Sequence, residues 1–112
     1  MNGLRMSGTG QNPLSVILEL SHRMLQQAQA GEWDDVLRDE EERRGVIEQA
    51  FPLSQALATA PSTAELLKRI IECDNRVMEL GAKAQDEAKG MLTRLQKGRR
   101  ATAAYQKTGS NL

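Results

Sequence analysis

The chain has 112 residues, and its 15 lysines and arginines balance 15 aspartates and glutamates, so the formal net charge is zero. A chain of this length forms one small domain, and its balanced charge argues against a dedicated nucleic-acid binder, which would carry a basic excess. Only 3% of the residues are aromatic, so aliphatic side chains must build the core, and no apolar run is long enough to span a bilayer.

Composition divides the chain into three predicted parts. Residues 1–11 are rich in glycine, serine, asparagine and threonine and lack the apolar centre of a secretory signal, so we predict a flexible leader and a cytoplasmic protein. Residues 12–98 are predicted to form a helical bundle domain. Residues 99–112 are predicted to form a basic, helix-capable tail.

The first predicted helix begins after Asn12, a typical N-cap residue, with Pro13 at the first helical position. It ends near Ala30, where Gly31 is expected to supply a left-handed conformation. Its apolar stripe recurs in steps of four and three residues and consists of Leu14, Leu18, Ser21, Leu25 and Ala28.

The second predicted helix spans residues 32–51 and places Trp33, Leu37, Ile47 and Phe51 on one face. Gly31 and Trp33 are predicted scaffold residues, since truncating a buried tryptophan to alanine costs about 3–5 kcal/mol.

The same periodicity places Glu40 and Arg44 in the middle of that face. One interpretation is a solvated i,i+4 pair worth only about 0.3–0.5 kcal/mol. The other is a shielded polar belt that sets the register of the helices or orients a partner.

The third predicted helix is the longest. Residues 53–60 add a helical turn or two before it, Ser62 and Glu65 resemble a capping box at its start, and Gly98 is expected to end it. One stripe along it suits the core and consists of Leu66, Ile70, Cys73, Val77, Leu80, Ala84, Ala88, Met91 and Leu95. A second stripe adds Leu67, Ile71 and Met78, which are either ordinary core or a groove for a partner's amphipathic helix.

These elements predict an all-α fold: an antiparallel helical bundle or long helical hairpin of three main helices plus a short C-terminal helical tail. Catalysis is not expected, because His22 is predicted to be an exposed surface residue and Cys73 a small buried one. No metal site and no cofactor are predicted.

The segment Gln29-Ala30-Gly31-Glu32-Trp33-Asp34, followed by Leu37, Glu40 and Ile47-Glu48, resembles the FliT-type flagellar export chaperones, which are small cytoplasmic all-helical proteins. The resemblance covers the first helix through the third. It implies binding of the flagellar filament cap protein, protection of the helical end of that protein, and delivery to components of the type III export apparatus. In some bacteria the family also binds a flagellar transcription regulator.

The resemblance also implies a hydrophobic groove on the middle helices, which a C-terminal helical segment can cover. Carried over to this chain, the expected partner-binding residues are Leu37, Glu40, Arg44, Ile47, Leu67, Ile71 and Met78. The expected self-masking residues are Leu92, Leu95 and Tyr105, so deletion of everything after Gly98 should tighten cargo binding.

Two alternative functions remain at this point. The chain is a transcriptional adaptor that binds a regulator without touching DNA, or it is a structural coiled-coil element whose third helix forms a homodimer. Direct nucleic-acid binding through Arg99 and Arg100 is not expected, because two arginines make too few phosphate contacts. Membrane insertion is not expected either.

Overall fold

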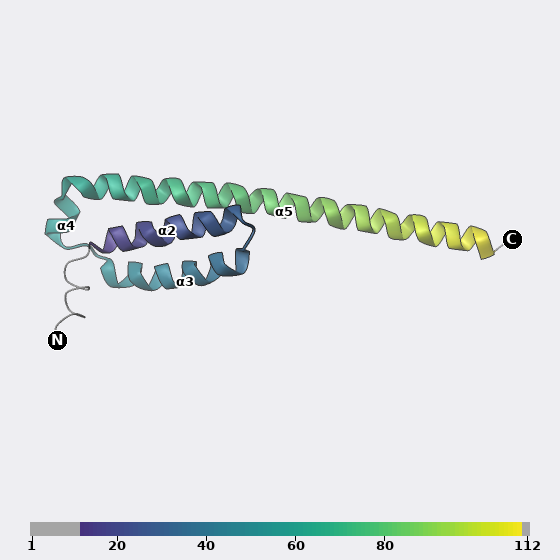
Figure 1. Ribbon diagram of the computed structural model, residues 1–112, viewed down its shortest axis with the longest axis horizontal. Helices are drawn as coiled ribbons and strands as arrows, with labels where there is room; N and C mark the ends of the chain where they lie inside the picture. Colours follow the sequence, from purple (N-terminus) through teal and green to yellow (C-terminus); the bar gives the residue numbers. More distant parts are fainter. Residues whose placement is uncertain (1–11, 111–112) are drawn as a thin grey trace. The chain divides into compact units, whose positions relative to one another are not determined.

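The computed structural model describes residues 12–110, so the predicted leader, residues 1–11, lies outside the described part. Within these described residues lie four helices: α2 (Pro13–Gln29), α3 (Trp33–Ala50), α4 (Gln55–Thr59) and α5 (Pro61–Ser110) (Figure 1). No strand occurs between residues 12 and 110, and the predicted all-α class is confirmed. The chain divides into two compact units, one ending at Leu80 and the other beginning at Gly81.

Both ends of α2 follow the predicted capping chemistry. The Asn12 side chain accepts a hydrogen bond of 2.8 Å from the Leu14 amide, and Pro13 occupies the first turn. At the other end, Gly31 has a φ of 76°. The amides of Gly31 and Glu32 donate to the carbonyls of Ala28 and Gln27 at 3.1 and 2.8 Å. This pair of bonds is a Schellman motif, which terminates α2 and reverses the chain into α3.

The start of α5 differs from the predicted capping box. The helix begins at Pro61, whose fixed φ and missing amide hydrogen suit a first helical position, so Ser62 and Glu65 lie inside the helix. Glu65 instead pairs with Arg69 at 3.2 Å. The Thr63 hydroxyl donates to the Leu57 carbonyl and ties the start of α5 to α4.

The predicted end of the third helix at Gly98 is wrong, and the helical tail predicted after it is a continuation of the same helix. α5 continues through Gly98 to Ser110 as one helix. The left-handed φ that glycine supplies at a helix end is found only at Gly31 among the described residues. An interior glycine costs up to about 1 kcal/mol relative to alanine, and the lysine, arginine and alanine residues around Gly98 are good helix formers that offset this cost.

The core of the first unit lies where α2, α3 and the part of α5 up to Leu80 run side by side (Figure 1). One buried cluster joins α2 to α5 and consists of Leu14, Ile17, Leu18, Ile70 and Cys73. A second cluster, nearer the α2–α3 turn, consists of Met24, Ala28 and Val36, with Trp33, Val77 and Leu80 packed against it. The single tryptophan therefore packs where the turn meets α5.

Candidate partner-binding surface

Two arginines connect the helices of the first unit through carboxylates. Arg23 of α2 donates from Nε and Nη2 to the two carboxylate oxygens of Asp39 of α3, at 2.7 and 2.8 Å. This hydrogen bonding is the main cause that holds the pKa of Asp39 below its usual value. Asp39 is therefore a buried carboxylate that stays ionised near neutral pH and orients α2 against α3.

Arg43 of α3 is 9% exposed and contacts the two other long helices. Its Nη1 donates to the Ser21 hydroxyl of α2 at 2.8 Å and to the Asp74 carboxylate of α5 at 2.6 Å. Its Nε has no hydrogen-bond partner within the described residues. One side chain thus sets the mutual register of α2, α3 and α5.

The predicted polar pair, Glu40 and Arg44, is an exposed ion pair of 2.8 Å on the surface of α3. Its solvated interpretation is the correct one, and the shielded belt consists of Asp39 and Arg43 instead. A signal for this was present in the sequence, because Val36, Asp39, Arg43 and Val46 recur in steps of three and four. Ser21, a small polar residue in the apolar stripe of α2, was the second signal.

The α5 stripe, defined here as Leu67, Ile71, Asp74 and Met78, recurs in steps of four, three and four along one helix face. Leu67 is half-buried and packs against the first core cluster. Ile71 and Met78 are 57% and 64% exposed. Asp74 lies between them and is held by Arg43 from α3. The result is an ion pair flanked on α5 by two exposed aliphatic side chains.

The remaining expected partner-binding residues lie on α3. Ile47 is half-buried and packs against the same core cluster as Leu67. Leu37 is largely exposed. The structure therefore packs Ile47 and Leu67 against the same core cluster, leaves Leu37, Ile71 and Met78 exposed, and places the Glu40–Arg44 pair at the surface.

The expected self-masking residues belong to the second unit. Leu92, Leu95 and Tyr105 are each more than half exposed. They lie on the same continuous helix as the α5 stripe.

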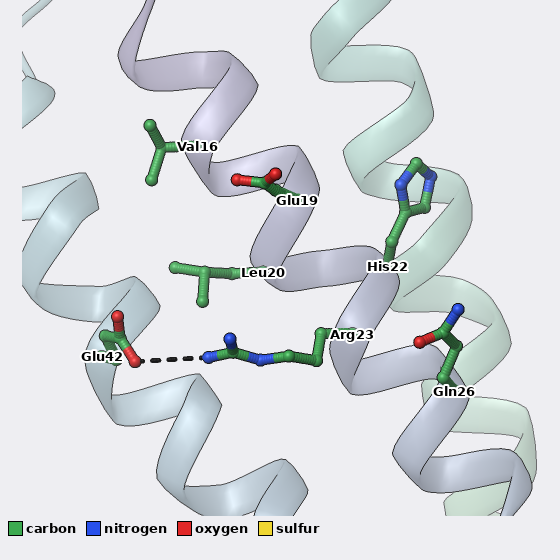
Figure 2. Close-up of a pocket in the computed structure, with 7 residues that line it drawn as sticks. All are labelled: Val16, Glu19, Leu20, His22, Arg23, Gln26 and Glu42. Atoms are coloured by element: carbon green, nitrogen blue, oxygen red, sulfur yellow. Dashed lines mark hydrogen bonds and ion pairs between the residues drawn. The ribbon is translucent and has the colours of Figure 1, made fainter. Parts of the chain in front are cut away.

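A shallow hollow of about 460 Å³ lies on α2 beside α3. Figure 2 shows Arg23 reaching across from α2 to Glu42 of α3, an ion pair of 3.4 Å. Val16 and Leu20 lie on the same side of α2, whereas His22 projects elsewhere. None of the seven expected partner-binding residues lines this hollow.

Groups suited to catalysis or metal binding do not converge in the described part of the chain. Residues 12–110 contain no cluster of three or more metal-ligating side chains. His22 is exposed, and Cys73 is buried, as predicted. Burial raises the pKa of the Cys73 thiol, and the charges of Asp74 and Glu72 add to the effect, so the reactive thiolate is disfavoured. Within the same residues, no helix has the length and apolarity needed to cross a membrane.

These features define a class of protein. It is a small all-helical protein in which buried polar contacts of Asp39 and Arg43 hold the helices in register, and its longest helix carries exposed apolar side chains. A family model described as flagellar protein FliT matches residues 12–107. The chain belongs to this family of flagellar chaperones. No curated protein and no solved structure matches it.

Proposed function

We propose that this protein is a cytoplasmic flagellar type III export chaperone that acts by binding rather than by catalysis. Its cargo is the helical C-terminal region of the filament cap protein, which it keeps soluble and delivers to the export apparatus. The observation that carries this proposal is the pair of exposed residues, Ile71 and Met78, on the core helix α5 of a chain that belongs to the FliT family.

The cargo surface proposed here is built around the α5 stripe. Ile71 and Met78 supply the apolar contact, and a fully buried side chain of this kind contributes about 1.5–3 kcal/mol. Methionine adapts to different cargo shapes because its side chain is unbranched and flexible. Two or three such contacts are consistent with binding that is strong enough for storage and weak enough for release at the export apparatus.

Residues of α3 are proposed to form the edge of the same surface. Leu37 and Ile47 extend the apolar contact, and the exposed pair of Glu40 and Arg44 guides the orientation of the cargo. Charges at an interface edge affect association rate and specificity more than affinity.

The test is co-expression with the C-terminal segment of the filament cap protein, followed by co-purification and titration. We expect a stable complex and expect Met78→Gln to weaken it about tenfold, which corresponds to roughly 1.4 kcal/mol. Met91→Gln is the matched control, because Met91 is a similarly exposed methionine of the same helix, 57% exposed, outside the proposed surface.

A folded helical protein that does not bind the cap-protein segment contradicts the proposal. Binding to a purified flagellar transcription regulator, without cap-protein binding, would then support the adaptor alternative. A molecular mass twice that of the monomer in light scattering, without cargo affinity, would support the dimerisation alternative.

A further inference from the structure

The zero net charge of the chain conceals a separation of charge along the sequence. Residues 1–87 contain nine lysines and arginines against 15 aspartates and glutamates, whereas residues 88–112 contain six basic residues and no acidic ones. The first segment is acidic and the second is strongly basic. The basic residues are Lys89, Arg94, Lys97, Arg99, Arg100 and Lys107.

These residues lie on α5 in the second unit, where the helix is also amphipathic. With a rotation of about 100° per residue, the four large apolar side chains fall within an arc of about 140°. They are Met91, Leu92, Leu95 and Tyr105, and each is more than half exposed. Arg94 lies about 20° outside one edge of this arc and Arg99 about 20° inside the other, and the other cations lie farther round the helix.

We propose that residues 88–107 of α5 form a docking segment for the surface of an anionic lipid bilayer. Helices that lie in a membrane interface combine an exposed apolar face with lysine and arginine on the other face. Arg94 and Arg99 are long enough to reach the lipid phosphates while their aliphatic parts stay beside the apolar arc. The remaining cations are attracted by the negative surface potential of the bilayer without contacting individual phosphates.

The wide distribution of the cations favours a bilayer over a single acidic helix. A partner helix contacts one side of α5, so the cations on the far side would contribute little to its binding. A negatively charged surface acts over a Debye length of about 8 Å, which is comparable to the helix diameter of about 10–12 Å. Cations on the far side of the helix therefore still contribute to attraction by the lipid surface.

The apolar arc favours a bilayer over nucleic acid. Phosphate binding would use the cations but would leave Met91, Leu92, Leu95 and Tyr105 in contact with water. A bilayer interface accommodates both groups, because the apolar side chains enter the boundary between headgroups and acyl chains. This mode of docking is adsorption to the surface and requires no membrane-spanning helix.

The experiment is co-sedimentation of the full chain with vesicles. Vesicles of phosphatidylethanolamine and phosphatidylglycerol are compared with vesicles of phosphatidylcholine, at low and at high salt. We expect binding to the phosphatidylglycerol vesicles only, with a marked loss at high salt. The proposal does not depend on cargo binding, so the two can fail separately.

Two double variants test the two parts of the segment. Arg94→Gln with Arg99→Gln is expected to weaken binding roughly 20- to 30-fold, since each cation at the surface contributes about fivefold. Its matched control, Lys68→Gln with Arg76→Gln, removes two exposed cations from the first unit and is expected to change binding less than twofold. Leu92→Gln with Leu95→Gln is expected to weaken binding with all six cations in place. Phe51→Gln is its control, because Phe51 is an exposed apolar residue of the first unit outside the proposed cargo surface. Circular dichroism checks that each variant remains helical.

Several results would overturn the proposal. Absence of binding to phosphatidylglycerol vesicles at low salt would do so. Equal loss of binding in the control variant Lys68→Gln with Arg76→Gln would show that total charge, not this segment, is responsible. Binding to duplex DNA with none to vesicles would assign the segment to nucleic acid. Full binding by Leu92→Gln with Leu95→Gln would show that the apolar arc does not enter the lipid.

Discussion

Arg43 and Arg44 are consecutive residues of α3 in contrasting surroundings. Arg43 is buried and binds Ser21 and Asp74, whereas Arg44 is exposed and pairs with Glu40 one turn away. Removing one partner of a buried ion pair leaves the other charge uncompensated, while an exposed helical pair contributes little. The rotation of α3 therefore decides which arginine stabilises the fold.

We expect Arg43→Ala to lower the free energy of unfolding by about 2–3 kcal/mol, less than for a fully buried pair because Asp74 is partly exposed. Arg44→Ala, the matched control, is expected to lower it by no more than about 0.5 kcal/mol. Urea unfolding followed by Trp33 fluorescence measures both. Equal losses for the two variants would show that Arg43 does not lock the helices.

At the scale of elements, glycine ends a helix at the α2–α3 turn but lies inside the helix in α3 and α5. Gly31 has a positive φ and closes α2, so its lack of a side chain is needed there. Gly45 lies inside α3, and an added Cβ would meet no atom within 4 Å. Gly98 likewise lies inside α5 with nothing within that distance. A glycine in the sequence therefore marks a helix end only where the backbone adopts the left-handed conformation.

Gly31→Ala is expected to lower the free energy of unfolding by about 1–2 kcal/mol, because the left-handed region is strained for alanine. Gly45→Ala is expected to raise it by about 0.5–1 kcal/mol through better helix propensity. Thermal unfolding by circular dichroism compares the pair. Stabilisation by Gly31→Ala would contradict the assigned closing role of this residue.

At the scale of the whole molecule, the proposed cargo surface and the self-masking residues lie on one helix. The α5 stripe belongs to the first unit, and Leu92, Leu95 and Tyr105 belong to the second. Because α5 is continuous through Gly98, a deletion after Gly98 cuts a helix rather than removing a separate tail. Self-masking by the segment after Gly98 therefore remains a proposal.

If the C-terminal segment masks the cargo surface, changing its apolar side chains should tighten cargo binding. The combined variant Leu92→Gln, Leu95→Gln and Tyr105→Gln is expected to bind the cap-protein segment about twofold more tightly if masking occupies half the time. Deletion after Gly98 is expected to act in the same direction. Titration calorimetry without lipid measures both, and unchanged or weaker affinity would contradict self-masking.

Much of the fold was predictable because it depends on local interactions. Asn12, Pro13 and Gly31 act on their own backbone neighbours, so the bounds of α2 and the turn into α3 follow from a few adjacent residues. The start of α5 was missed because Pro61 and the contact of Thr63 with Leu57 compete with the capping residues Ser62 and Glu65. The solvated interpretation of Glu40 and Arg44 agrees with the structure, whereas the buried polar contacts of Asp39 and Arg43 were not predicted.

The sequence by itself determined the helical class, the capping of α2, the closing turn at Gly31 and the basic character of the last 25 residues. Tertiary structure alone decided that Asp39 and Arg43 are buried while Glu40 and Arg44 are exposed, and that Ile71 and Met78 remain exposed beside the core. The reason is geometric. Neighbouring residues of a helix differ by about 100° in direction, so only the packing of α2, α3 and α5 selects which face is enclosed.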